Sequence, residues 1–305
     1  MLRLDKLREL TLRFAPGPGR PCHLSAASGL VHVGDRLYVI ADDEHQLGVF
    51  SAEGSEPGTL LTVLPGRLPD STPERKAAKA DLEALTRLPA MLEFPHGVLF
   101  ALGSGSRPNR EVGALIELDA WGLAGEPAIQ INLRRLYSAL RTRLPALNIE
   151  GAFTTADHFC LLHRGNKRDS TNACVRLPLR ATLDSLAEGN PVGATMPLDI
   201  RTFDLGAIRG VPLCFTDGAA LPDGRFVFTA VAEDTEDSYE DGPCQGAAVG
   251  LVDVDGRVCM LEHLERCHKI EGVAARLDGG IIHLLLVTDP DDPALPAEVL
   301  AGTLR

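Results

Sequence analysis

Aromatic and basic residues are scarce in this sequence. Only 5% of its 305 residues are aromatic, with one Trp and three Tyr, which is little material for stacking on bases or sugar rings. Acidic residues outnumber basic ones by 42 to 30, so the formal net charge is −12 at pH 7. Binding to a phosphate backbone needs a basic surface that releases counterions. We therefore expect no nucleic-acid partner.

Long hydrophobic runs are also missing. The longest strongly apolar segment, IIHLLLV at residues 281–287, is far shorter than the roughly 20 residues of a membrane-spanning helix. The first ten residues mix charged and apolar side chains, unlike the uninterrupted apolar centre of a secretory signal. We expect a chain that neither crosses a membrane nor is secreted.

Paired cysteine motifs are absent too. The seven cysteines form no C-x-x-C pair, and an odd number cannot all be paired within one chain. An unpaired cysteine most often acts as a small buried hydrophobe. The cysteine pattern therefore favours a reduced, cytoplasmic protein.

Familiar catalytic motifs do not occur. The sequence contains no G-x-S-x-G elbow, no H-E-x-x-H, no Walker loop and no G-x-G-x-x-G that follows a strand. His45, His163 and His268 are the candidate general bases, but a histidine without an identified partner is more often structural. No catalytic residue can be assigned by motif.

A repeated segment is what the sequence does contain. Five short stretches each carry a small polar or acidic residue followed by Gly or Ala. They are ASGL at 27–30, LEAL at 82–85, IEGA at 149–152, TDGA at 216–219 and IEGV at 270–273. Each is followed by a turn signal and an apolar run, and two further short strands fit behind most of them. Repeats of this kind are typical of β-propellers.

The pattern predicts an all-β fold, a propeller of five four-stranded blades in a single domain at 1–305. The last repeat lacks a fourth strand, and the alternating segment 7–14 can supply it and close the ring. Six blades are the alternative, if 180–212 hides a degenerate one. The expected blades are 27–66, 81–133, 148–206, 214–263 and 269–304, with the closing strand 7–14.

Three segments have helical rather than alternating spacing, at 72–80, 133–141 and 179–189. We expect them to be short helices or loops inserted before a blade's first strand, decorating one face.

The repeated polar residues predict where a site lies. In a propeller blade the first strand begins on the face where the second ends, so the polar positions gather at one channel mouth. They are Ser28, Glu83, Glu150, Asp217 and Glu271. Carboxylates in a narrow channel repel one another, which raises their pKa values or attracts a cation. Ca²⁺ suits irregular sets of oxygen ligands, although another divalent cation, or solvated channel acids without any ion, would fit as well.

Basic residues interrupt the acidic mouth at the third blade. Arg164, Lys167 and Arg168, together with Arg107 and Arg110, could anchor a phosphate or carboxylate of a small anionic substrate. The alternative is simple charge balance. The acidic run at 233–241 is more typical of a solvated loop, and 289–293 of a rigid turn. A site would then lie off the axis, toward blade three.

The segment DGAALPDGR at 217–225, with IEG at 149–151 and at 270–272, resembles bacterial propellers related to the esterase-like domain associated with phytases. More distantly it is similar to calcium-dependent lactonases of the gluconolactonase and paraoxonase type. The resemblance implies calcium held at the channel mouth, and a metal that activates water or polarises an oxygen.

The positions that match this implied calcium site are Glu83, Glu150, Asp217 and Glu271, with Asn166 as a companion, whereas Ser28 departs from the acidic pattern. The expected function is a metal-dependent hydrolase of phosphoesters, esters or lactones. Arg164, Asn166, Lys167 and Arg107 are its expected substrate-binding residues. The alternative is a non-catalytic propeller that serves as a platform for a ligand or a protein partner.

Overall fold

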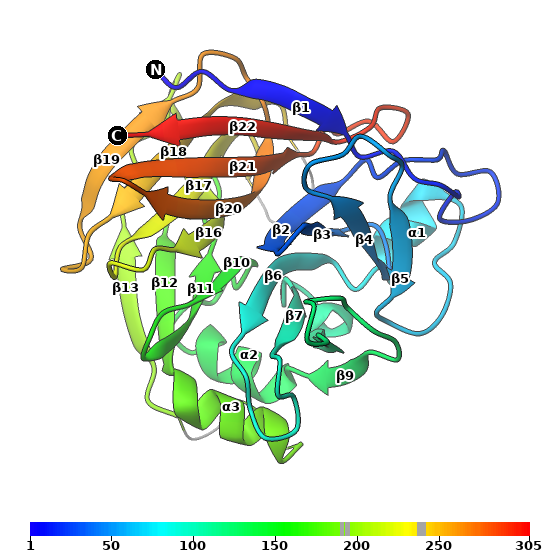
Figure 1. The fold of residues 1–305 in the computed structure, drawn as a ribbon. Helices are drawn as coiled ribbons and strands as arrows, with labels where there is room; N and C mark the ends of the chain where they lie inside the picture. The colour runs from blue at the N-terminus through cyan, green and yellow to red at the C-terminus, as the bar shows by residue number, and fades with distance from the viewer. Residues whose placement is uncertain (190–191, 193–195, 237–241) are drawn as a thin grey trace.

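Five four-stranded antiparallel sheets surround a central axis (Figure 1). The structure, a computed structural model, describes residues 1–189, 192, 196–236 and 242–305. Each inner strand contacts the inner strands of the two neighbouring blades, so the ring is closed. The five-bladed propeller is confirmed, and the six-blade alternative is wrong. The 180–212 region instead holds one helix, the outer strand of the third blade and a small hairpin of β14 (Ala207–Ile208) with β15 (Val211–Pro212).

The strands follow the order expected from the repeats. The inner strands are β2 (Ala27–Val33), β6 (Leu82–Leu88), β10 (Ile149–Thr154), β16 (Cys214–Ala220) and β20 (Ile270–Asp278). The second strands are β3 (Arg36–Ala41), β7 (Val98–Gly103), β11 (His158–His163), β17 (Phe226–Glu233) and β21 (Ile281–Thr288). The third strands are β4 (Gln46–Ser51), β8 (Val112–Glu117), β12 (Asn172–Pro178), β18 (Cys244–Val252) and β22 (Glu298–Leu304). The outer strands are β5 (Thr59–Thr62), β9 (Ile129–Asn132), β13 (Asp199–Phe203), β19 (Val258–His263) and β1 (Asp5–Glu9).

Burial explains why the second strands are almost continuously apolar. Every residue of β7 and β17 is buried, because each blade is covered on both faces by its neighbours. Apart from the buried Arg8 of β1, the residues of the outer strands are exposed or half-buried, and these strands carry more polar residues, as in β9. The alternation of apolar and polar residues along the chain is therefore weak in the middle of each blade.

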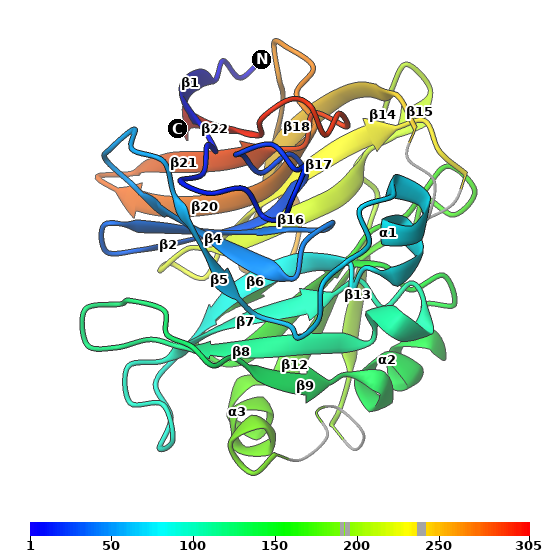
Figure 2. The same ribbon diagram turned by 90° about the vertical axis from the view of Figure 1, so that its right-hand side faces the viewer.

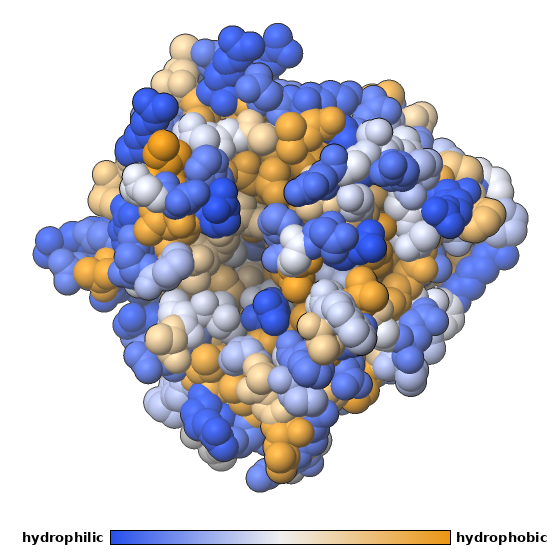
Figure 3. All heavy atoms as spheres, viewed as in Figure 1, coloured by the Kyte–Doolittle hydropathy of each residue, from blue (hydrophilic) through white to orange (hydrophobic). Residues whose placement is uncertain are grey.

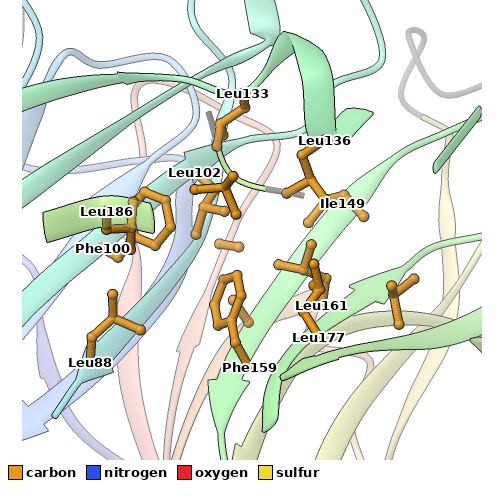
Figure 4. Close-up of a cluster of buried hydrophobic side chains, with 14 of the residues drawn as sticks. Leu88, Phe100, Leu102, Leu133, Leu136, Ile149, Phe159, Leu161, Leu177 and Leu186 are labelled. Carbon is orange, nitrogen blue, oxygen red and sulfur yellow. The ribbon is translucent and has the colours of Figure 1, made fainter. Parts of the chain in front are cut away.

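Separate apolar clusters lie at each of the five boundaries between blades. The cluster between the second and third blades joins Phe100 and Leu102 of β7 to Phe159 and Leu161 of β11 (Figure 4). Shape-matched packing at these boundaries fixes how the blades sit around the axis.

The closing strand is shorter than predicted. β1 pairs antiparallel with β22, which confirms closure by the N-terminal segment, but it spans Asp5–Glu9 rather than 7–14. The pairing skips Leu7, so the bulge leaves that side chain 52% exposed and turns Arg8 inward. Beyond β1, Leu10 and Leu12 are buried in the cluster between the fifth and first blades.

Three helices match the expected segments: α1 (Thr72–Ala78), α2 (Arg134–Arg141) and α3 (Leu179–Ala187). Figure 2 shows α1 and α2 on one side of the ring and α3 at its rim. The expectation that all three precede a first strand on one face is wrong for α3. It lies between β12 and β13, because its apolar positions 179, 183 and 186 share one helical face and pack into the cluster between the second and third blades.

None of the helices in the described residues has the length and apolar character needed to span a bilayer. In the second blade, Pro108–Arg110 forms a single 3₁₀ turn in the loop after β7. That turn carries Arg110 toward the axis, where it becomes part of the site.

Candidate functional site

A β-bulge at the start of each inner strand positions the channel residues. In four blades the pairing with the second strand skips one residue, and that residue is Ser28, Glu83, Glu150 or Glu271. A bulged residue has no partner across the ladder, so its side chain can turn in a new direction. All four side chains line one cavity at the channel mouth.

The fourth blade differs by one residue from the predicted repeat. There the pairing skips Thr216, so Thr216 is the structural equivalent of the four channel residues. Its hydroxyl donates a 2.8 Å hydrogen bond to the carbonyl of Ile270. Asp217 therefore occupies the next position, which is Gly or Ala in the other blades, and it is not among the residues that line the cavity. That Asp217 binds a metal stays a prediction.

The small residue after the bulge allows neighbouring inner strands to approach. A Cβ on Gly151 would lie 2.8 Å from the Cα of Asp217, and one on Gly272 would lie 2.9 Å from the backbone nitrogen of Leu30. Such distances leave no room for a side chain. The blades are therefore crowded at the axis, which accounts for the Gly or Ala at this position.

The cavity offers about 60 Å³ to the centres of water molecules, room for several waters or a hydrated ion. Figure 3 looks onto the opposite face of the ring, from which the loops after β6 and β8 project, and that face is also hollowed at its centre. Residues from the starts of the first strands and from the loops after the second strands meet in the cavity, as expected. The charged lining residues are Asp42, Asp81, Glu83, Glu150, Glu233, Glu271, Asp289, Lys76, Lys79, Arg110, Arg164 and Lys269.

Three carboxylates from the first two blades form the tightest acidic group. One oxygen from each of Asp42, Asp81 and Glu83 lies within 4.8 Å of the others. Lys79 pairs with Asp42 and lies 2.9 Å from Asp81 Oδ1. Arg110 Nη1 lies 2.5 Å from Asp81 Oδ2.

Glu83 is the exception in this group. Within the described residues no hydrogen bond or ion pair reaches its carboxylate, although Asp42 and Asp81 are both paired. Burial, and then repulsion from Glu150 and Asp81, raises the pKa of Glu83 well above its usual range. Lys79 attracts this carboxylate without pairing with it, and burial and repulsion outweigh that attraction.

A second group, on the third to fifth blades, is compensated by two buried bases. Arg164 pairs with Glu150 at 3.2 Å, with Glu233, and with Glu271 at 3.9 Å. Lys269 lies 3.6 Å from Glu233 Oε1 and 3.9 Å from Glu271 Oε1. Burial opposes the charge of Arg164, yet the three glutamates outweigh it and raise its pKa.

Lys269 extends toward a loop of aspartates. Its ammonium lies 3.5 Å from Asp289 Oδ2 and 2.5 Å from Asp291 Oδ1. Burial raises the pKa of Asp289 to about 7, in spite of the attraction of Lys269. Asp289 can therefore gain or lose a proton near neutral pH.

A larger cleft of about 210 Å³ opens beside the cavity and shares four residues with it. The shared residues are Asp42, Lys76, Lys79 and Asp289. Arg20 and Arg75 lie further along the cleft, and both pair with Glu44. The cleft opens between the first and fifth blades, whereas the cavity itself is also lined by Arg164 and Asn166 of the third blade. That a site lies toward blade three stays a prediction.

Two of the four predicted substrate-binding residues line the cavity, and two do not. Arg164 and Asn166 line the cavity, whereas Lys167 and Arg107 are not among its lining residues. Arg164 neutralises glutamates and Lys167 Nζ pairs with Asp234 at 2.8 Å, the geometry that the charge-balance alternative expects. Their role in binding a substrate stays a prediction.

The three candidate histidines also lie outside this cavity lining. His163 is buried, its Nδ1 lies 3.1 Å from the backbone nitrogen of Asn148, and burial lowers its pKa to about 4. It is therefore neutral at pH 7 and holds the start of β10.

Sequence reasoning missed Asp81, Asn148 and Lys269, each two residues before a bulged glutamate. All three line the cavity. The patterns DLE, NIE and KIE at these strand starts carry the signal, because a polar residue recurs two positions before the glutamate in three of the repeats. Lys79 lies just outside that pattern, at the end of the α1 segment.

Fold and site together define a five-bladed propeller with a charged cavity at one channel mouth. Residues 23–304 match the model of a family described as a family of unknown function (DUF6929), and the chain belongs to this family. No curated protein matches it in sequence.

Among solved structures, a luciferin-regenerating enzyme is similar over 93% of this chain and 92% of its own, with 7% identity and a TM-score of 0.42. A sialidase is similar over 99% of this chain and 32% of its own, with 13% identity and a TM-score of 0.41. A mutant of Synechocystis ACO, an apocarotenoid oxygenase, is similar over 99% and 66%, with 14% identity and a TM-score of 0.39. These similarities concern the fold and carry no statement about activity.

Proposed function

We propose that this protein is a divalent-metal-dependent hydrolase of small phosphoester, ester or lactone substrates, with its metal between Asp42, Asp81 and Glu83. The observation that carries the proposal is the Glu83 carboxylate, which faces two other carboxylates without a partner of its own among the described residues. A divalent cation would relieve this repulsion.

The acidic group has suitable dimensions for a hard cation. Oxygens bound to Ca²⁺ lie 2.3–2.6 Å from the ion, so any two of them are at most about 5 Å apart. The three carboxylate oxygens here lie within 4.8 Å of one another. Water molecules in the cavity would complete the coordination. Ca²⁺ is the first ion to test, because it tolerates ligands from separate blades.

The surrounding residues have distinct parts in this proposal. A metal at this place would polarise a carbonyl or phosphoryl oxygen and lower the pKa of a bound water. Lys79, Arg110 and Ser104 hold the carboxylate of Asp81 in place. Asp289, with a pKa of about 7 and a position in both cavity and cleft, is the candidate proton acceptor.

The cleft is the proposed place of the substrate. Drug-sized ligands occupy pockets of roughly 300–1,000 Å³, so only the reacting group of a substrate would enter the cavity of about 60 Å³. The cleft of about 210 Å³ would hold the rest of a small anionic molecule, next to Lys76 and Lys79. The resemblance of the strand starts to phytase-associated and lactonase propellers points to the same chemistry.

Calorimetry with Ca²⁺, Mg²⁺ and Mn²⁺ on chelator-treated protein tests the metal. We expect about one ion per chain for the wild type, at least tenfold weaker binding for Glu83→Gln, and no change for Asp278→Asn. Asp278 is an exposed aspartate paired with Arg276, so it is a matched control. Absence of binding for all three ions would overturn the proposed metal site.

Turnover of p-nitrophenyl phosphate, p-nitrophenyl acetate and a γ-lactone tests the reaction. We expect metal-dependent hydrolysis of at least one substrate, lost in Glu83→Gln and kept in Asp278→Asn. Metal binding without turnover of any of the three would favour a binding function instead.

A non-catalytic platform for a protein partner is the second candidate. Leu92 is 93% exposed and Trp121 80% exposed. Figure 2 shows the loops after β6 and β8, which carry them, projecting from the side opposite α1 and α2. Large apolar side chains at loop tips are suited to a partner surface. Under this candidate, Leu92→Ser with Trp121→Ser abolishes partner capture, and Glu83→Gln leaves it intact.

A further inference from the structure

Two cysteines from neighbouring segments meet beside the cavity. Cys244 begins β18 in the fourth blade, and Cys267 lies in the connection from β19 to β20. Cys267 Sγ lies 2.9 Å from Cys244 Sγ and 3.3 Å from the carbonyl oxygen of Cys244. A disulfide joins sulfurs about 2.0 Å apart, so bond formation needs a movement of less than about 1 Å.

The two thiols differ in their exposure to solvent. Cys267 is exposed, and Cys244 is only partly exposed. Burial, and then the hydrogen bond with Cys267, raises the pKa of Cys244 to about 12. A dissolved oxidant therefore reaches Cys267 first, with Cys244 as the second thiol.

Chain connections link this pair to the cavity. Cys244 is the cross-strand partner of Glu233, the last residue of β17. Cys267 comes two residues before Lys269, and Lys269 Nζ lies 3.6 Å from Glu233 Oε1 inside the cavity. A covalent bond between the cysteines would therefore restrain both members of a cavity ion pair.

We propose that Cys244 and Cys267 form a reversible disulfide that fastens the approach to β20 against β18 and holds the Glu233–Lys269 pair in place. A cytoplasmic protein seldom keeps a structural disulfide, and pairs that do form there are usually redox-responsive. The proposal goes beyond the hydrolase function and does not depend on it.

The reaction uses a small disulfide such as glutathione disulfide as its oxidant. The Cys267 thiolate attacks one sulfur of glutathione disulfide, forms a mixed disulfide and releases one glutathione thiolate. Cys244 then loses its proton and attacks the Cys267 sulfur, which releases the second glutathione. Two protein thiols are oxidised, one glutathione disulfide is reduced, and the two thiol protons end on the two glutathione molecules.

The other cysteines provide comparisons within the chain. Cys22 and Cys259 are exposed, and no cysteine contacts either of them among the described residues. Cys160 and Cys174 lie on neighbouring strands, but both are buried away from a dissolved oxidant. Cys267 is thus the exposed thiol with a second sulfur in contact.

The test is thiol mapping on the full chain. Protein is equilibrated with reduced and oxidised glutathione at several ratios, alkylated, and examined by intact mass and peptide mapping. We expect oxidation to remove two alkylatable thiols and to cross-link the peptides that contain residues 244 and 267. Cys22→Ser should also lose two alkylatable thiols on oxidation, as the wild type does. Cys267→Ser should lose none and should show no cross-link.

Hydrogen exchange tests the structural consequence. In the oxidised wild type, amides of residues 263–271 should exchange at least threefold more slowly than in the reduced protein, and Cys267→Ser should show no redox dependence. Stable glutathione adducts on Cys267, a cross-link to another cysteine, or unchanged exchange after cross-linking would each overturn the proposal. The cross-link is mapped on the wild-type protein. The proposal can therefore be tested even if Cys267→Ser does not fold.

Discussion

The Asp217 carboxylate accepts a 2.9 Å hydrogen bond from the backbone N–H of Val273, across the boundary between the fourth and fifth blades. Asp217 is 1% exposed, and burial raises the pKa of its carboxyl well above the usual range. The other blades have Gly or Ala at this position. Asp217 therefore joins β16 to β20 by a side-chain hydrogen bond. At the equivalent position of other blades, as at Gly151 and Gly272, the backbones of neighbouring inner strands come close together instead.

The first prediction separates this role from metal binding. Asp217→Ala should lower the free energy of unfolding by about 1–3 kcal/mol, because the Val273 N–H loses its acceptor. Asp217→Asn keeps an acceptor and should be nearly neutral. Denaturant unfolding measures both, and calorimetry should find cation binding unchanged in Asp217→Asn. Loss of cation binding in a folded Asp217→Asn protein would instead support the ligand set inferred from the repeat.

Most of the fold could be predicted because propeller blades repeat a hairpin signal. Turn residues followed by apolar runs located all five second strands, and the run RLYVIA at 36–41, after the turn signal at 34–35, coincides with β3. The one-residue difference in the fourth blade has a physical cause. In TDG both Thr216 and Asp217 are polar, and the sequence does not say which of two adjacent residues is skipped by the ladder.

The candidate site was predictable only in part. Glu83, Glu150 and Glu271 were found because they recur at strand starts. Asp42 lies in the loop after β3, which the strand order places at the mouth without singling out this residue. Lys79 reaches the cavity from the end of a helix, so no repeat marks it. The pairing of Arg164 with three glutamates depends on how blades three to five sit together, which lies beyond a local pattern.

The second prediction concerns the crowded axis. Gly151→Ala places a Cβ 2.8 Å from the Cα of Asp217, so the blades must shift and the free energy of unfolding should fall by about 1–3 kcal/mol. Gly125→Ala is the matched control, since a Cβ there meets nothing within 4 Å. Thermal unfolding of both variants measures the difference. Equal stability of the two would contradict close packing at the axis.

The third prediction concerns the compensation of the glutamates. Arg164→Met leaves Glu150, Glu233 and Glu271 with less positive charge, and removal of one partner from a buried ion pair costs about 3–5 kcal/mol. Adding Glu271→Gln should recover part of the loss, because one uncompensated carboxylate is removed. A double-mutant cycle from denaturant unfolding measures this coupling. Additive effects of the two substitutions would show that the residues act independently.

The fourth prediction concerns the pH dependence of stability. Burial raises the pKa of Asp289 from 3.8 to about 7, so between these values the folded state holds a proton that the unfolded state has lost. Stability from this group is therefore present at low pH and falls as pH rises from about 4 to 7. The raised pKa values of Glu83 and Glu271 act in the same direction, whereas Lys79 and Lys269 stay charged throughout this range.

Asp289→Asn should reduce this slope, because the amide has no proton to lose. The difference in unfolding temperature between pH 5 and pH 8, measured by calorimetry without divalent ions, should be smaller than in the wild type. Asp278→Asn should leave the difference unchanged, since that side chain is exposed. A wild-type unfolding temperature that rises from pH 5 to pH 8 would contradict the direction. It would mean that the ion pairs of Lys269, rather than burial, dominate the proton equilibrium of Asp289.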